Sequence, residues 1–116
     1  MTAQQQDFEV FSGNDKVLRC TLVDDAGAPV SLAGILGAEW ALAKTATGTA
    51  KITKTLGAGI AVFNEDGGVL DVTVTDDDLE PLAGEYYHEL RVTDSSGKKT
   101  TVLYGDVTIF PNLVRS

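Results

Sequence analysis

Apolar residues that recur at every second position constrain this chain more than any other feature of its sequence. The alternation occurs in six short runs, at residues 8–10, 18–22, 36–42, 70–74, 86–92 and 103–109. Successive side chains of a β-strand point to opposite faces, so a period of two places one set in the core and the other in solvent. The β-branched residues Val, Thr and Ile, which favour strands, number 12, 13 and 4 among 116 residues. The sequence therefore predicts an all-β fold.

The alternation also assigns individual side chains to a face. Leu36 shares the inner face of its run with Trp40, and His88 shares the inner face of its run with Leu90. In the last run, Val102 shares the outer face with Tyr104.

Turn signals separate these runs. Asp24–Gly27 and Asp94–Gly97 share the pattern Asp-x-x-Gly, in which the Asp side chain can bond the backbone and Gly tolerates positive φ. We expect these two segments, together with 45–49 and 64–68, to form hairpin turns between adjacent antiparallel strands. Turns at intervals of about 8–12 residues favour an antiparallel β-sandwich of about seven to eight strands.

One segment departs from the strand pattern. Thr75 can cap a helix, and the acids Asp76, Asp77 and Asp78 that follow it are favoured in a first helical turn. We therefore expect one short helical turn near residues 76–82. No shift in composition marks a second domain. The predicted organisation is a flexible N-terminal tail over residues 1–6, a single β-sandwich over residues 7–111 and a C-terminal tail over residues 112–116.

The balance of charge excludes two classes of partner. The chain carries 9 basic and 17 acidic residues, for a formal net charge of −8. Nucleic acids and anionic lipids bind clusters of Lys and Arg, so we expect no direct contact with nucleic acid or membrane. No stretch approaches the roughly 20 apolar residues of a transmembrane helix. Cys20 is the only cysteine, so no internal disulfide can form, and we expect folding in a reducing compartment.

The residues most often used in catalysis offer no constellation in this chain. His88 is the only histidine, and it and Cys20 fall on apolar faces, where structural roles are favoured over catalytic ones. The densest acidic cluster, 76–78, lacks the spacing of a Ca²⁺ loop and is explained by helix capping. We expect no catalytic site, no bound metal and no cofactor, and therefore a protein that is not an enzyme.

Two features are candidates for an interaction surface. Tyr87, Tyr104 and Phe110 alternate outward, and we expect them to form a subunit interface, with a sugar-binding platform as the alternative. Residues 41–64 contain three lysines and no acid, whereas residues 65–80 contain seven acids and no base. Such patches can set the register between copies, although they can also be two solvated surfaces. The predicted interface residues are Lys44, Lys51, Lys54, Asp76, Asp77, Asp78, Tyr87, Tyr104 and Phe110.

The order of several motifs resembles a known family. Residues 24–34 are similar to the pattern D-x-x-G-x-P-V-D-L-T-G, and a short strand with a Trp follows at 38–42. Residues 54–60 match K-T-L-G-x-G-I, and residues 78–97 include the pattern G-x-Y-x-x-E-x-x-V-T-D-x-x-G. With the final strand at 102–110, this order resembles the small Ig-like domains of tailed-phage virion proteins. It is similar to the N-terminal domain of phage baseplate upper proteins and to free-standing Ig-like accessory proteins of the head, neck or tail.

The resemblance implies a fold and a function. The fold would be an Ig-like β-sandwich, in a non-enzymatic structural or accessory protein that docks by surface complementarity at the head, neck, tail or baseplate. The protein would be part of the virion after assembly in the host cytoplasm. Its partners would be other virion proteins and copies of itself, in an oligomer that follows the symmetry of the particle. The alternative function is a carbohydrate-binding adhesion module on the particle surface, with a host glycan as ligand.

Overall fold

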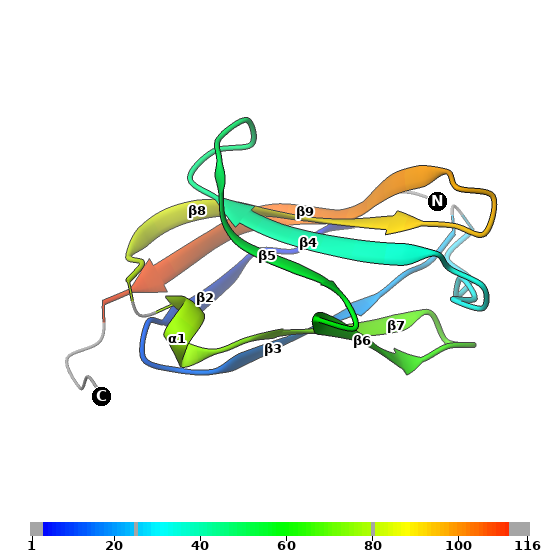
Figure 1. Ribbon diagram of the computed structural model, residues 1–116, viewed down its shortest axis with the longest axis horizontal. Helices are drawn as coiled ribbons and strands as arrows, with labels where there is room; N and C mark the ends of the chain where they lie inside the picture. Colours follow the sequence, from blue (N-terminus) through cyan, green and yellow to red (C-terminus); the bar gives the residue numbers. More distant parts are fainter. Residues whose placement is uncertain (1–3, 25, 80, 112–116) are drawn as a thin grey trace.

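The computed structural model describes residues 4–24, 26–79 and 81–111 and shows an all-β protein (Figure 1). The elements of the described chain are β1 (Gln4–Gln5), β2 (Phe8–Phe11), β3 (Lys16–Thr21), β4 (Gly37–Ala43), β5 (Ala50–Leu56), β6 (Gly59–Asn64), β7 (Val69–Val74), α1 (Asp76–Leu79), β8 (Gly84–Thr93) and β9 (Lys99–Phe110). In these residues no helix is long and apolar enough to cross a membrane.

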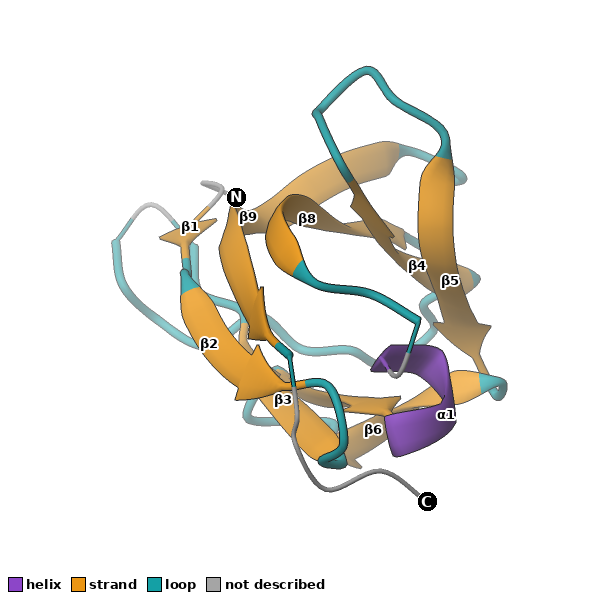
Figure 2. Cartoon of the chain, turned by 90° about the vertical axis from the view of Figure 1, so that its left-hand side faces the viewer, coloured by secondary structure: helices purple, strands orange, loops and turns teal. Residues whose placement is uncertain are grey.

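The strands form a two-layered sandwich. Figures 1 and 2 show a larger layer of β4, β5, β8 and β9 above a smaller layer of β3, β6 and β7. Hydrogen bonding connects the strands in the order β1-β9-β8-β4-β5-β6-β7-β3, with β2 also on β9. The predicted β-sandwich is confirmed. The sheet is mixed, however, because β1–β9, β2–β9 and the short β5–β6 contact are parallel pairings.

Three of the four predicted hairpins are present: β4–β5, β6–β7 and β8–β9 are antiparallel pairs. The prediction of a fourth, joining adjacent strands at Asp24–Gly27, is wrong. The turn itself forms, with the Asp24 carboxylate accepting hydrogen bonds from the backbone N–H groups of Ala26 and Ala28. The antiparallel pairing around this turn is short: the Asp24 N–H donates to the Ala28 carbonyl and the Val30 N–H to the Leu22 carbonyl, on either side of the bridge between Val23 and Pro29. β3 pairs with β7 instead, and the chain crosses to β4 in the other layer.

Most of the inward side chains that the alternation predicts are buried, and Leu36 and Val102 depart from the prediction. Leu36 is 66% exposed, because β4 begins one residue later and Leu36 lies at the rim of the sheet. Val102, expected on the outer face, is only 1% exposed. A β-bulge explains it: Leu90 is opposite Leu103 but Arg91 is opposite Thr101, so Val102 is an extra residue that turns inward.

The N-terminal segment is part of the sheet from Gln4 onward. Gln4 pairs with Leu103 and Phe8 with Val107, so β1 and β2 follow β9 in one continuous parallel register. This differs from the expected tail over residues 1–6, of which residues 1–3 lie outside the described chain, as does the expected tail over residues 112–116. The N-terminal segment lies closest to β9 at Gly105, where an added Cβ would collide with the Gln6 carbonyl and the Asp7 carboxylate.

A buried chain of hydrogen bonds connects the core to this N-terminal segment. The indole N–H of Trp40 donates to Nδ1 of His88 at 3.0 Å. The imidazole proton is therefore on Nε2, which donates to the carbonyl oxygen of Gln6. His88 has no exposed surface, so its predicted inward position is confirmed, and burial lowers its pKa below the ordinary value.

The buried imidazole makes stability depend on pH. Because the pKa of His88 is lower in the folded state than the unfolded value near 6.5, the unfolded chain binds more protons below that pH. We expect the free energy of unfolding to fall with acidification below pH 6.5, by up to about 1.4 kcal/mol per pH unit. Urea unfolding at pH 5.0–8.0 measures this.

His88→Gln is the matched variant, because it removes the titration and keeps a side chain with a donor and an acceptor. It should be less stable than the wild type at pH 8 and should show a much flatter profile between pH 6.5 and 5. Equal slopes in both proteins would contradict the assignment.

Candidate docking surface

The register places one set of side chains on the solvent side of the larger layer. Residues directly opposite each other on paired strands project to the same side of a sheet. We call this side the outer face. It is formed by Glu39, Ala41 and Ala43 of β4, Glu85, Tyr87, Glu89 and Arg91 of β8, Lys99, Thr101, Tyr104, Asp106, Thr108 and Phe110 of β9, and Glu9 and Phe11 of β2, with Thr53 and Thr55 of β5 at its margin.

One end of the outer face holds an acidic hollow of about 320 Å³. It is lined by Asp7, Phe8, Glu9, Glu85, Asp106 and Thr108. The Asp7 carboxylate accepts a hydrogen bond from the backbone N–H of Asp106 at 2.8 Å, which fixes the N-terminal segment against β9. Four carboxylates from three separate strand regions thus border one depression. We call it the acidic hollow.

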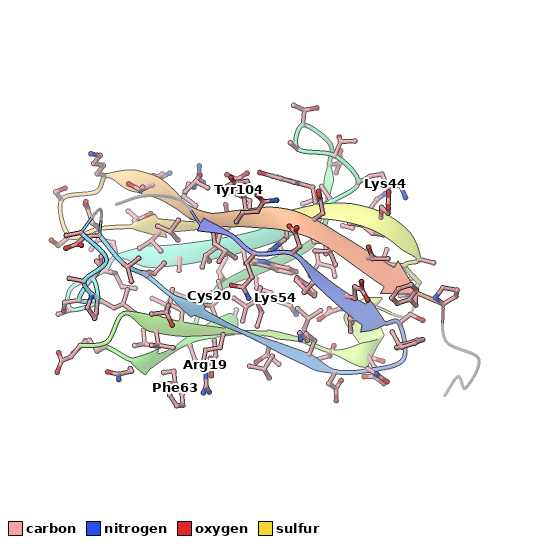
Figure 3. All side chains as sticks on the ribbon, turned by 180° about the vertical axis from the view of Figure 1, so that it is seen from behind. Arg19, Cys20, Lys44, Lys54, Phe63 and Tyr104 are labelled. Carbon is pink, nitrogen blue, oxygen red and sulfur yellow. The ribbon has the colours of Figure 1, made fainter. Side chains whose placement is uncertain are left out.

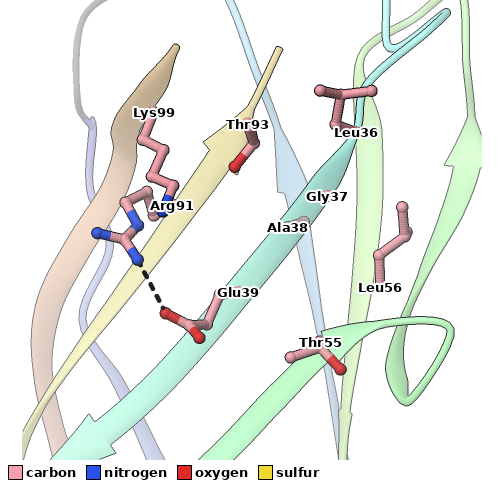
Figure 4. Close-up of a pocket in the computed structure, with 9 residues that line it drawn as sticks. All are labelled: Leu36, Gly37, Ala38, Glu39, Thr55, Leu56, Arg91, Thr93 and Lys99. Atoms are coloured by element: carbon pink, nitrogen blue, oxygen red, sulfur yellow. Dashed lines mark hydrogen bonds and ion pairs between the residues drawn. The ribbon is translucent and has the colours of Figure 1, made fainter. Parts of the chain in front are cut away.

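The opposite end holds a second hollow, of about 350 Å³, shown in Figure 4. Leu36 and Leu56 form one side of it, and Arg91 and Lys99 form the other. Arg91 pairs with Glu39 at 3.2 Å, so its charge is already partnered within the chain. The outer face therefore carries excess negative charge at one end and a weakly basic, partly apolar depression at the other.

Two of the three predicted aromatic residues lie between the hollows. Tyr87 and Tyr104 are half-buried neighbours on β8 and β9, because Tyr87 is opposite Asp106 and Tyr104 is opposite Glu89. Burial raises the pKa of the Tyr87 hydroxyl, and the surrounding negative charge of Glu89 and Asp106 raises it further. Phe110 lies farther along β9, where its ring is 5.4 Å from that of Phe11. The structure thus brings the two tyrosines together, with the phenylalanine in a separate contact.

The three predicted lysines differ in what they contact. Lys44 and Lys51 flank the β4–β5 connection, in which every residue from 44 to 51 is exposed. We call residues 44–51 the basic hairpin; it rises above the larger layer in Figure 1, and Lys44 is labelled beside it in Figure 3. The Lys44 ammonium lies 4.7 Å from the centre of the Tyr86 ring. Lys54 turns the other way and pairs with Asp78 at 2.7 Å.

The predicted acidic patch is largely used by the fold. Thr75 and Asp78 form a reciprocal cap. The Asp78 carboxylate accepts hydrogen bonds from the backbone N–H and the hydroxyl of Thr75, and the backbone N–H of Asp78 donates to the Thr75 hydroxyl. Burial favours a raised pKa for Asp78, but the bonds from Lys54 and Thr75 outweigh it and the pKa is lowered. Asp76 receives its own cap, since its N–H donates to Asp15. Among the described residues, no group of three or more His, Cys, Asp or Glu side chains is placed to bind a metal ion.

A further exposed cluster lies on the opposite side of the molecule, below the smaller layer in Figure 3. The Arg19 guanidinium is 3.6 Å from the centre of the Phe63 ring and makes two hydrogen bonds to Asp71, at 2.8 and 3.0 Å. The bonds from Arg19 lower the pKa of Asp71. Because its charges satisfy each other, this cluster is a weaker candidate than the outer face for recognising a charged partner.

No pattern in the sequence indicates the acidic hollow. Its residues come from segments about 80 to 100 positions apart, and they meet only because β2 pairs in parallel with β9 and β8 pairs with its other edge. The alternation does indicate that Glu9 and Asp106 point outward. No local signal indicates that the N-terminal segment lies beside the last strand.

Comparisons with known proteins identify the fold but no family. No family model matches the chain, and no curated protein matches it. Among solved structures, the chain is similar to the crystal structure of CopC from Methylosinus trichosporium OB3b, with a TM-score of 0.52 and 17% sequence identity, over 93% of this chain and 88% of that one. That protein is a β-sandwich, and at this identity the likeness shows the shared fold alone.

Cys20 provides a test of the buried core beneath these surfaces. Its thiol has no exposed surface, and burial raises its pKa to about 12. The thiolate is the reactive form, so we expect the folded protein to react with Ellman's reagent at pH 8 on the order of 1000-fold more slowly than the unfolded protein. Absorbance with and without 6 M guanidinium measures this, with Cys20→Ala as the blank. Fast reaction of the folded chain would be inconsistent with an inert core thiol.

The reciprocal cap at α1 gives a second test. Asp78→Asn removes the charge that binds Lys54 and weakens the bonds to Thr75, and we expect the free energy of unfolding to fall by about 1–2 kcal/mol. The neighbouring Asp77→Asn is the matched control, since Asp77 is exposed, and should change stability by less than about 0.5 kcal/mol. Similar losses in both variants would rule out a specific role for Asp78.

Proposed function

We propose that this protein is a non-enzymatic structural or accessory component of a tailed-phage particle, at the head, neck, tail or baseplate. It docks on its neighbours through the outer face and follows the symmetry of the particle. The observation that carries the docking part is the outer face itself, which combines two half-buried tyrosines, an acidic hollow and a projecting basic hairpin. Tyrosines surrounded by charged and polar residues are typical of protein–protein interfaces.

The assignment to a virion rests on the resemblance of the motifs. The residues that carry the resemblance are mostly those that build the scaffold: Asp24 bonds its own turn, Trp40 is buried, and Asp94 accepts hydrogen bonds from Ser96 and Lys98. Of the matched positions, Glu89 lies on the outer face, where it accepts from the hydroxyl of Thr101. The resemblance therefore supports the assignment to a virion protein, whereas the proposed docking residues are inferred from the geometry of the outer face.

The chemistry of the two most reactive side-chain types favours a structural role. His88 uses both ring nitrogens in buried hydrogen bonds, so neither is free to move a proton for a substrate. The Cys20 thiol is buried and protonated at neutral pH. Neither residue faces the hollows of the outer face.

The test is the composition of purified particles. We expect the protein to remain with particles through density-gradient purification, to be detected by mass spectrometry at a fixed stoichiometry, and to account for repeated density in a cryo-electron-microscopy map. Particles assembled without the gene should lack that density. A protein absent from purified particles would rule out the proposed function.

Reversing the charge of the basic hairpin tests, in the same particles, whether the hairpin takes part in docking. Lys44→Glu/Lys51→Glu should lower incorporation several-fold in competition with the wild-type protein, because it reverses the basic hairpin. Lys54 is left unchanged, since its partner is Asp78 and its reversal would disturb the fold. The comparison variant is Lys98→Glu/Lys99→Glu, which alters net charge by the same amount where the β8–β9 turn enters β9, away from the hairpin, and should lower incorporation less. Equal incorporation of both double variants would contradict a role for the hairpin.

The carbohydrate-binding alternative makes a different prediction. Tyr87 and Tyr104 would then stack on sugar rings, and a glycan array probed with the purified wild-type protein should give saturable binding that Tyr104→Ala abolishes. Binding of this kind by a protein that is absent from particle interfaces would favour the alternative.

A further inference from the structure

We propose that two copies of this chain pair through their outer faces, with the basic hairpin of each copy seated against the acidic hollow of the other. The inference rests on the proposed function for its premise that the outer face is a docking surface. It goes further by naming the occupant, a second copy of the chain, and the symmetry of the pair.

The order of the strands suits such a pair. Across the outer face the strands run β5-β4-β8-β9-β2, so β8 is the middle strand with two strands on each side. A two-fold axis parallel to β8 and lying between two facing copies would place β4 over the partner's β9, and β5 over the partner's β2. The same patch is then used on both copies, as a closed dimer requires.

The register places the hairpin and the hollow at the same level along the strands. Ala43, the last residue of β4, is opposite Tyr87 of β8, and Tyr87 is opposite Asp106 of β9. Asp7 is bonded to the Asp106 backbone at that level. Rotation about an axis along β8 keeps every residue at its own level, so the hairpin that leaves β4 after Ala43 meets the partner at Asp106 and Asp7.

Shape and charge agree with this placement. The basic hairpin stands out from the larger layer with all of residues 44–51 exposed (Figures 1 and 2), and the acidic hollow is a depression of about 320 Å³. Among the described residues, neither Lys44 nor Lys51 forms an ion pair within its own chain. The carboxylates of Asp7, Glu9, Glu85 and Asp106 border the hollow. Each hairpin therefore brings two positive charges, one of them over the Tyr86 ring of its own chain, to four negative ones, and the symmetry makes this contact twice.

The middle of the face can be covered by a second copy at moderate cost. It contains the half-buried Tyr87 and Tyr104 beside Ala41 and Ala43. The short alanine side chains allow a second copy to come close to the sheet. Of the charged side chains of β8, Arg91 pairs with Glu39, so its charge is balanced within the chain, and Glu89 accepts a hydrogen bond from the neutral hydroxyl of Thr101. Charged groups whose charge is balanced locally are less costly to bring near a copy of themselves.

A second two-fold arrangement of the same faces is possible, and it would bring a different lysine to the acidic hollow. An axis that crosses the strands would place Lys99, from the opposite end of the face, over the acidic hollow. Lys99 lies within its own depression and does not project, so the hairpin is the better-shaped occupant. Reversal of charge in the hairpin and at Lys98 and Lys99 separates the two arrangements.

Sedimentation equilibrium of the purified full chain tests the pairing at 1–500 µM protein, in 50 and 300 mM salt. We expect a monomer–dimer equilibrium that weakens with salt, and about 10-fold or greater weakening in Lys44→Glu/Lys51→Glu. Glu9→Lys/Glu85→Lys should weaken it similarly. Lys98→Glu/Lys99→Glu should weaken it several-fold less than the hairpin reversal does, because Lys99 lies on the outer face but at the end away from the acidic hollow. Near-ultraviolet circular dichroism verifies that each variant is folded. If Lys44→Glu/Lys51→Glu fails to fold, Lys44→Gln/Lys51→Gln takes its place.

The decisive measurement is a mixture of the two weakened variants. In a heterodimer of Lys44→Glu/Lys51→Glu with Glu9→Lys/Glu85→Lys, the unchanged hairpin of the second variant meets the unchanged hollow of the first. The reversed hairpin of the first variant meets a hollow whose four charges now sum to zero instead of four negative charges. The mixture should therefore dimerise more tightly than either variant alone. A wild-type protein that is monomeric throughout, a dimer weakened only by the Lys98 and Lys99 reversals, or a mixture no tighter than its components would each overturn the pairing. If the protein is monomeric in solution but present in purified particles, the pairing is wrong and the proposed function stands. If it dimerises as expected but is absent from particles, the proposed function is wrong and the pairing stands.

Discussion

The buried hydrogen-bond chain from Trp40 through His88 to Gln6 is the interaction on which the rest of this structure depends. It joins the centre of β4 to β8 and then to the N-terminal segment, which is also paired in parallel with β9. That segment supplies Asp7 and Glu9 to the acidic hollow. A neutral imidazole deep in the core therefore helps to position two of the four carboxylates that border the hollow, together with the β2–β9 pairing and the bond from the Asp106 backbone to Asp7.

The strand geometry around β9 shapes the outer face in two places. Gly105 has no side chain, so the Gln6 carbonyl can approach β9 closely and the Asp7 carboxylate can reach the Asp106 backbone. The bulge at Val102 adds a residue to β9 and turns Val102 into the core, which sets the register of Tyr104 and Asp106 against β8. Without the bulge, strict alternation would place Lys99 and Tyr104, which are five positions apart, on opposite faces.

The division of charge in the sequence has two different roles in space. Lys54 and Asp78, from the basic and the acidic segment, meet within the chain and help to hold α1 against β5. Lys44 and Lys51 remain on a projecting hairpin, while the carboxylates that could receive them come from the N-terminal segment, β8 and β9. Among the described residues, the ion pair between Lys54 and Asp78 joins the basic and the acidic segment, and the docking role of the other lysines and acids stays a prediction.

The sequence by itself determined the strands, three of the hairpins, the helical cap at Thr75–Asp78 and most of the buried side chains. These follow from short-range physics: the period of two, the φ preferences of glycine, and side-chain bonds to nearby backbone. The exceptions, Leu36 and Val102, depend on where a strand begins and where a bulge falls. Only the tertiary structure decided that the N-terminal segment adds to β9, and that Asp7, Glu9, Glu85 and Asp106 border one hollow. The pairing of strands about 99 residues apart depends on the packing of the whole core around His88, and no local pattern encodes it.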